Sequence, residues 1–202
     1  MTHDLRPGAA RRLLAHEGRV LASFGLWLTR RRHQVGPVDR AFGYAGAQAA
    51  TVYGLAFVCV VETVGVSFLV RDWPTVHAVL LVLDLYTVVW ILGMQAAAVT
   101  RPHVLTPDAL RLRQGARVDL VVPLDRIARV RRELRFQGAG GAGPREDLEL
   151  AVGSQTSLTV ELTGPVTHVP LLGQRREVTV VRFHADESGD LARALTAALA
   201  RP

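Results

Sequence analysis

Two long apolar runs constrain the fold of this chain more than any other feature of its sequence. They extend over residues 47–70 and 75–100, and each contains one carboxylate, Glu62 in the first and Asp84 in the second. A helix needs about 20 mostly apolar residues to cross the hydrocarbon core of a bilayer. Both runs are long enough, so the sequence predicts two transmembrane helices. The alternative, a pair of buried core helices, would be unusual in a soluble chain of 202 residues.

The segment between the two runs predicts a helical hairpin. Residues 71–74 read "RDWP", where Pro74 suits the first turn of a helix and Trp73 suits a membrane interface. Arginine is abundant on both sides of the hairpin: residues 1–46 carry eight Arg against three acids, and residues 101–202 carry fifteen against twelve. By the positive-inside rule, both termini are expected in the cytoplasm, which makes this a multi-pass protein of the inner membrane.

The segment before the hairpin has the pattern of an amphipathic helix. Leu14, Leu21, Phe24 and Leu28 share one helical face, and arginines including Arg30–Arg32 frame it. A basic amphipathic helix of this kind lies in the membrane interface. The alternative is a helix that packs on the cytoplasmic domain. The expected order is a flexible N-terminus at 1–12, an interfacial helix at 13–33 and a linker at 34–46.

Glu62 and Asp84 form the candidate intramembrane polar pair. Glu62 precedes Arg71 by nine residues and Asp84 follows Pro74 by ten, which places both about 15 Å below the outer turn, near the bilayer midplane. Each lies in a thin polar stripe that we expect to face the other helix or a partner chain. Neither run contains an Arg or Lys, so we expect at least one carboxylate to be protonated at neutral pH.

Three interpretations of the two carboxylates remain open. They can form a hydrogen-bonded clasp within the hairpin or a homodimer, or a docking point for a basic group on another membrane protein. The third interpretation is a proton- or ion-handling site. Because two spans alone make a poor transport pathway, the first two are favoured. Small residues at a spacing of four predict separate ridges for close helix packing; these are Gly46, Ala50 and Gly54 in the first run, and Gly93 and Ala97 in the second.

Residues 101–202 change to the period of β-strands. Apolar and polar residues alternate, turns are expected at "TPD" and "RQGA", and "QGAGGAGPRED" reads as a flexible loop. Further short strands are expected at "LELAV", "LTVEL", "HVPLL" and "EVTVVRFH". The last segment predicts an amphipathic helix with Leu191, Leu195 and Leu199 on one face. The predicted fold is therefore α+β: membrane helices followed by a small antiparallel β-barrel or bent sheet capped by a C-terminal helix.

Several of these segments carry a resemblance to a known family. "VLTPDALRLRQG", "VPLDRIARVR" and "VTVVRFHADESGDLARAL" resemble bacterial pleckstrin-homology-like domains that occur beside paired membrane spans. With "VVETVGV" in the first span and "TRPHVLTPDAL" after the second, nearly the whole chain is similar to small actinobacterial integral membrane proteins. The resemblance implies a cytoplasmic pleckstrin-homology-like domain. It implies no activity and no catalytic residues.

A cluster of arginines in this domain is a candidate contact with anionic lipid of the inner leaflet, although a solvated surface explains it equally well. The cluster consists of Arg126, Arg129, Arg131, Arg132 and Arg135.

The sequence contains none of the motifs we associate with catalysis. It has no phosphate-binding loop, no zinc-protease motif, no nucleophile elbow, and a single cysteine, Cys59. His103, His168 and His184 are interpreted as structural or surface histidines, so no metal and no cofactor are expected, and no nucleic-acid platform is visible. We expect a non-enzymatic, membrane-anchored interaction or scaffold protein whose partners are the lipid bilayer and either a second copy or another membrane protein. The alternative is a small subunit of a transport or proton-handling assembly that uses Glu62 and Asp84.

Overall fold

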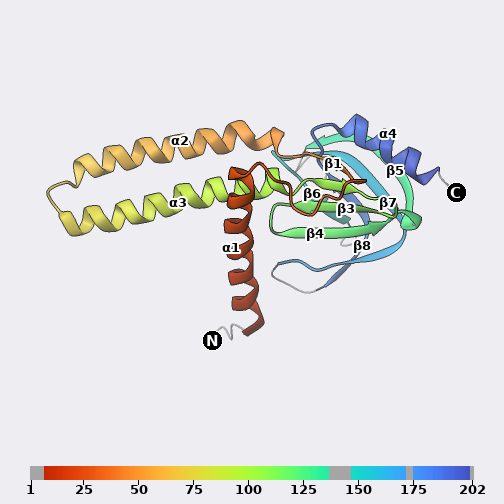
Figure 1. Cartoon of the computed structure of the whole chain (residues 1–202), viewed down its shortest axis with the longest axis horizontal. Coiled ribbons are helices and arrows are strands. Elements are labelled where there is room, and N and C mark those ends of the chain that lie inside the picture. Colours follow the sequence, from red (N-terminus) through yellow and green to blue (C-terminus); the bar gives the residue numbers. More distant parts are fainter. Residues whose placement is uncertain (1–6, 137–146, 172–174, 201–202) are drawn as a thin grey trace.

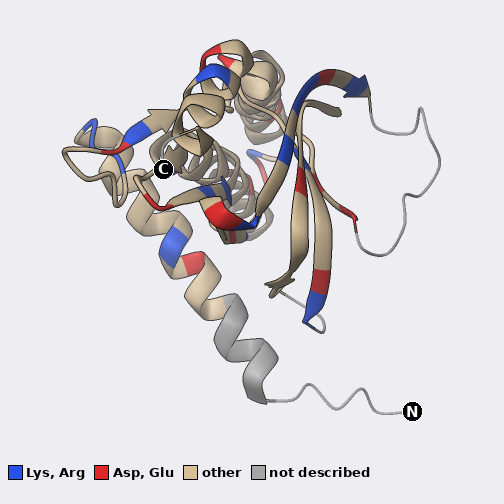
Figure 2. Ribbon diagram, turned by 90° about the vertical axis from the view of Figure 1, so that its right-hand side faces the viewer, with Lys and Arg blue, Asp and Glu red and all other residues tan. Residues whose placement is uncertain are grey.

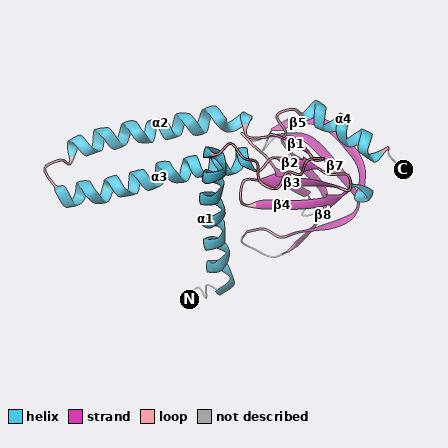
Figure 3. Cartoon of the chain, in the orientation of Figure 1, coloured by secondary structure: helices cyan, strands magenta, loops and turns pink. Residues whose placement is uncertain are grey.

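A computed structural model describes residues 7–136, 147–171 and 175–200 of the chain. These residues form an α+β structure with two long apolar helices and two four-stranded sheets (Figures 1 and 3). The helices are α1 (Pro7–Leu28), α2 (Gly46–Leu69), α3 (Pro74–Thr100) and α4 (Ser188–Leu199). The strands are β1 (Arg40–Phe42), β2 (His103–Leu105), β3 (Ala109–Gln114), β4 (Val118–Pro123), β5 (Ile127–Phe136), β6 (Asp147–Leu150), β7 (Gln155–His168) and β8 (Arg176–Phe183).

Helices α2 and α3 lie side by side and antiparallel, and they project away from the sheets as an extended arm (Figure 1). We call this arm the apolar hairpin. Both helices are long and apolar enough to cross a membrane, and only 6% and 11% of their most hydropathic windows are buried. Large apolar side chains such as Phe57 and Phe68 point outward, with exposed fractions of 68% and 70%. The hairpin therefore differs from the mostly buried core helices of a soluble domain.

Helix α1 runs across the end of α3 nearest the sheets, instead of continuing along the hairpin (Figure 1). Val20 and Ser23 are buried at this crossing. A Cβ atom at Gly93 of α3 would come within 2.8 Å of Val20 Cγ1, so the absence of a side chain at Gly93 permits the close approach. Leu14, Leu21 and the last residue of the helix, Leu28, remain exposed.

The strands and α4 form a unit with its own core, which we call the β domain. One sheet has the order β1-β2-β3-β4, and the other has the order β5-β7-β8-β6. Alternation places Leu110 and Leu112 of β3 inside, where they are completely buried. Leu191 and Leu195 of α4 are completely buried in the same core, as their spacing predicted. The helix thus covers an apolar face that the sheets alone would leave exposed.

The structure corrects several details of the expected strands. Residues 34–46 are more than a linker, because β1 pairs antiparallel with β2 and brings Phe42 into the core. Strand β6 pairs parallel with β8, so the second sheet is mixed rather than antiparallel. "HVPLL" is not a separate strand: β7 continues to His168, and residues 169–171 leave the sheet.

The ends of the predicted segments also move. Helix α1 begins at Pro7, inside the expected flexible N-terminus, and ends at Leu28, before the expected end at 33. The first six residues, and residues 137–146 of the segment that the sequence predicts to be a flexible loop, lie outside the described residues.

Candidate functional site

Glu62 and Asp84, the acids predicted to form an intramembrane pair, occupy different positions on the apolar hairpin. Gln48 donates a hydrogen bond to Gln95 at 3.4 Å, and this contact sets the register of α2 against α3. Cys59 lies eleven residues after Gln48, and Asp84 lies eleven residues before Gln95. Asp84 therefore lies level with Cys59 and is half-buried, whereas Glu62 is exposed on the surface of α2. Among the described residues, neither Glu62 nor Asp84 has a partner in a hydrogen bond or an ion pair.

The two small-residue ridges differ in what they contact. Gly93 and Ala97 lie where α1 crosses α3, and Ala97 is almost completely buried. Ala50 and Gly54 are exposed on α2, and a Cβ atom at Gly54 would meet nothing within 4 Å. Gly46 has another role, described below.

Four of the five arginines of the predicted cluster lie along β5, and Arg126 directly precedes the strand in a short 3-10 helix. This strand begins at the end of the β domain farthest from the hairpin and runs back along its side (Figure 1). Figure 2, which views the molecule from the β-domain end, shows basic and acidic residues interspersed along the strand. Arg131 forms an ion pair with Glu161 of β7, and Arg135 lies 4.0 Å from Glu133. Part of the positive charge of this cluster is therefore neutralised within the domain.

The three histidines of the β domain do not form a shared site. His103 is completely enclosed, accepts a hydrogen bond from the Arg113 backbone N–H at its Nδ1 and donates from Nε2 to the His184 carbonyl oxygen at 2.9 Å. Burial lowers the pKa of His103 to about 4, so it is neutral at pH 7. His168 lies at the far end of β7. Among the described residues, no group of three or more His, Cys, Asp or Glu side chains is arranged to hold a metal.

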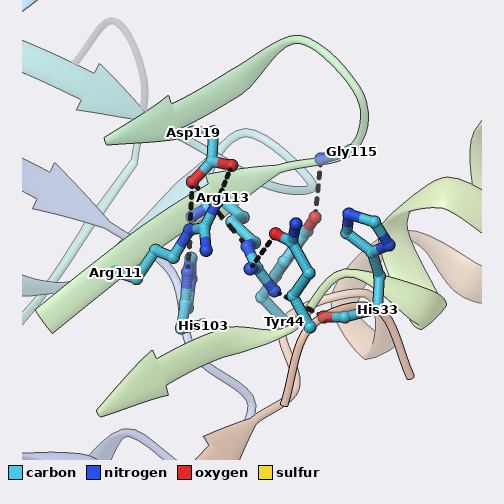
Figure 4. Close-up of polar contacts among 8 residues, drawn as sticks. His33, Tyr44, His103, Arg111, Arg113, Gly115 and Asp119 are labelled. Atoms are coloured by element: carbon cyan, nitrogen blue, oxygen red, sulfur yellow. Dashed lines mark hydrogen bonds and ion pairs between the residues drawn. The ribbon is translucent and has the colours of Figure 1, made fainter. Parts of the chain in front are cut away.

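A network of arginines at the base of the hairpin is the most unusual polar feature that the structure brings together (Figure 4). Arg111 binds Asp119 through two hydrogen bonds of 2.6 and 2.5 Å. Arg113 is only 1% exposed and donates to the carbonyl oxygen of His33 at 2.9 Å and to Gln34 at 3.3 Å. We call Arg101, Arg111, Arg113 and Asp119 the arginine junction. It ties the chain after α1 to the first sheet.

The arginine junction holds more positive than negative charge in a partly buried place. Arg101 follows α3 directly, is 8% exposed and donates from Nε to Ser23 Oγ of α1 at 3.0 Å. Burial lowers the pKa of Arg101, and the nearby Arg19 lowers it further. Burial alone would raise the pKa of Asp119, but its hydrogen bonds and the charges of three arginines outweigh burial and hold that pKa below its usual value. Asp119 is therefore ionised at neutral pH.

Two further contacts fasten the hairpin to the β domain. Tyr44 is buried next to Ala45, Ala98 and Val152, and its hydroxyl accepts a hydrogen bond from the Gly115 N–H at 2.6 Å. Burial raises the pKa of Tyr44 to about 12. Both carboxylate oxygens of Asp186, which precedes α4, lie 3.1 Å from the backbone N of Gly46 at the start of α2. The first turn of α2 therefore receives its acceptor from the β domain.

Sequence reasoning missed the arginine junction. The alternation of apolar and polar residues predicted the strand β3 and its buried leucines, but it gave no sign that Arg113 is buried as well. Arg113 is buried because α1 and residues 33–34 cover this side of the sheet. One signal was available: Arg101 directly follows an apolar helix, where a cation near the helix C-terminus is favoured.

No protein-family model matches the chain, and no significant match to it appears among curated proteins or solved structures.

Proposed function

We propose that this chain is a non-enzymatic, membrane-anchored interaction protein. In this proposal the apolar hairpin spans the inner membrane, α1 lies in the interface of the inner leaflet, and the β domain is a cytoplasmic pleckstrin-homology-like domain. The observation that carries the proposal is the outward orientation of the large apolar side chains on α2 and α3. Exposure of this apolar surface to water has a high free-energy cost, whereas contact with lipid chains does not.

The position of α1 supports an interfacial helix. The helix lies across the end of the hairpin from which the chain enters the β domain (Figure 1). Leu14, Leu21 and Leu28 are spaced by seven residues, so they share one side of the helix, and they are 63–69% exposed. Ala15 and Arg19 lie on another side, where they border a cleft against the β domain. An apolar side facing lipid and a basic side facing the domain suit the interface.

The β domain offers an edge strand to a protein partner. Strand β5 lies at the edge of the second sheet, and all of its residues except Ile127 are at least partly exposed. Near its end, Leu134 and Phe136 are 61% and 59% exposed. Exposed backbone at a sheet edge can pair with a strand of another protein, while the neighbouring arginines oppose uncontrolled pairing.

Membrane topology is the first test of the proposal. We expect the full chain to resist extraction by alkaline carbonate. Alkaline phosphatase should be active when inserted between residues 71 and 74 and inactive at the C-terminus, where green fluorescent protein should fluoresce. Release of the chain by carbonate, or active phosphatase at the C-terminus, would contradict the proposal.

The interaction role needs a separate test. We expect the full chain in native nanodiscs to retain a stoichiometric protein that the double variant Leu134→Ser/Phe136→Ser loses. Val121 of β4 is 49% exposed and lies in the other sheet, so Val121→Ser is the matched control and should keep that protein. Equal recovery with all three chains would argue against β5 as the contact surface.

A proton- or ion-handling subunit is the second candidate, and the exposure of Glu62 favours it. A carboxylic acid on the lipid-facing side of α2 needs a partner outside this hairpin, because burial in hydrocarbon without one is costly. Glu62→Gln and Asp84→Asn should then abolish proton or ion flux in membranes that contain the full chain, while the β domain stays folded. If these variants leave the flux unchanged and the β5 variants lose the bound protein, the interaction role is favoured.

A further inference from the structure

We propose that the cleft between α1 and the turn from β3 to β4 binds the headgroup of an anionic phospholipid of the inner leaflet. The cleft has a volume of about 340 Å³ and lies where α3 ends and the β domain begins. Four arginines line it against one carboxylate, Asp119; they are Arg19, Arg101, Arg113 and Arg117. This inference rests on the proposed position of the hairpin in the membrane.

Asp119 does not neutralise the cleft, because it is already engaged. Its two oxygens accept both hydrogen bonds from Arg111, which is outside the set of lining arginines. Arg113 Nε lies 3.8 Å from Asp119 Oδ1, too far for a hydrogen bond, and this buried nitrogen has no acceptor among the described residues. The positive charge therefore lacks a matching anion within the described chain.

Arg101 supplies the donors for such an anion. Its Nε is occupied by Ser23, but its two terminal nitrogens have no hydrogen-bond acceptor among the described residues. The side chain is more than nine-tenths buried and lines the cleft. A planar guanidinium with two free nitrogens matches the geometry of a phosphate group, and such charge-assisted hydrogen bonds are among the strongest in proteins.

An apolar groove beside the cleft indicates a lipid rather than a free phosphate. The groove has a volume of about 310 Å³ and shares Gly115, Ala116 and Arg117 with the cleft. It continues onto the hairpin, where it is lined by Val52, Leu55, Trp90, Ile91 and Met94. A headgroup in the cleft and an acyl chain in the groove would place each part of one lipid against matching chemistry.

Native mass spectrometry of the full chain released from detergent can test this inference. The probes are phosphatidylglycerol and phosphatidylcholine with the same acyl chains. We expect selective retention of phosphatidylglycerol. Arg19 and Arg117 are exposed, and their guanidinium groups form no hydrogen bond with the described residues. Arg19→Gln/Arg117→Gln should therefore fold normally and bind phosphatidylglycerol roughly 30-fold more weakly. The charge-matched control Arg126→Gln/Arg129→Gln, at the start of β5, should bind like the original chain.

Several results would overturn the inference. Equal retention of the two lipids, or equal binding by the Arg19/Arg117 variant, would remove the headgroup site. Loss of binding in the β5 control would move the site to β5. Displacement of the lipid by glycerol 3-phosphate at the same concentration would show that the groove contributes nothing. The single variant Arg117→Glu, in an exposed turn, gives a second test and should also lose selectivity.

Carbonate extraction of the same samples separates this inference from the proposed function. A chain that stays in the membrane but does not select phosphatidylglycerol contradicts the lipid site alone. A chain that carbonate releases contradicts both.

Discussion

The apolar hairpin and the β domain use the same kinds of side chain in opposite ways. In the β domain, Leu110 and Phe183 are completely buried. In the hairpin, Phe57 is 68% and Leu85 62% exposed. Burying one such side chain contributes roughly 1.5–3 kcal/mol. The β domain obtains this stabilisation from its own core, whereas the hairpin must obtain it from its surroundings.

The β domain and the apolar hairpin are therefore stabilised in different ways. Close packing makes the β domain sensitive to any loss of volume in its core. The hairpin has only a narrow contact between its helices, so its outward side chains should tolerate a change of size but not a change of polarity. The same substitution in both regions therefore distinguishes the two kinds of environment.

Removal of a large aromatic side chain should give the largest difference. We expect Phe183→Ala to destabilise the β domain by roughly 3–5 kcal/mol, since Phe183 is completely buried and touches the ring of His103. Phe57→Ala should change stability by less than about 0.5 kcal/mol, because in the proposed membrane position lipid can fill the space. Thermal unfolding of both full-length variants in nanodiscs measures this. An equally destabilising Phe57→Ala would show that a protein, not lipid, covers that face.

Introduction of a charge should affect the hairpin more than the β domain, the opposite of the effect of removing an aromatic side chain. Val61 of α2 and Val121 of β4 are similarly exposed, at 53% and 49%. We expect Val61→Arg to oppose membrane integration by roughly 2.5–3.5 kcal/mol, since an arginine near the middle of a span is costly. Val121→Arg should stay within about 0.5 kcal/mol, as a surface substitution normally does. The carbonate-resistant fraction measures integration, and equal integration of the two variants would place the hairpin in water.

Mild acid should weaken the β domain through His103. The pKa of this buried ring is lowered from 6.5 to about 4, so between these values the unfolded chain binds more protons than the folded one. Stability is then complete above pH 6.5 and falls as the pH falls, by roughly 2 kcal/mol at pH 5. Hydrogen exchange of β3 and β8 in the full chain measures this loss. His103→Gln should remove most of the slope, and an unchanged slope would assign the effect to other groups.

The sequence predicted the hairpin more accurately than the β domain. The expected spans of 47–70 and 75–100 agree with α2 and α3 to within one residue at each end. A long apolar run, with a proline at the start of the second, defines these helices locally. The terminal helix was also predictable, since Leu191 and Leu195 repeat at a spacing of four. These features depend on residues near one another in the chain.

The missed features depend on contacts between distant residues. Strand β1 has only three residues, and β2, which pairs with it, follows about sixty residues later, after the whole hairpin. Parallel pairing of β6 with β8 leaves no mark in the composition of either strand. Likewise, the burial of Arg113 follows from the packing of residues 33–34 against β3. No periodicity within a single segment reports such contacts.

Asp186 provides the smallest and most local test of the comparison, because it joins the two regions. Its carboxylate accepts the Gly46 N–H at the start of α2, and loss of such an acceptor costs about 1 kcal/mol. We expect Asp186→Ala to speed hydrogen exchange in the first turn of α2 and to leave the middle of the hairpin unchanged. Asp125→Ala, at an exposed site with no ion pair in the structure, is the control.

Gly46 makes this test specific to the contact. A Cβ atom at Gly46 would lie 2.9 Å from Asp186 Oδ1, so Gly46→Ala must displace the carboxylate in the original chain. In the Asp186→Ala background that obstacle is gone, and alanine is a better helix former than glycine by about 1 kcal/mol. We therefore expect Gly46→Ala to destabilise the original chain and to be neutral or stabilising in the variant. Equal effects in both backgrounds would show that Asp186 does not hold α2 to the β domain.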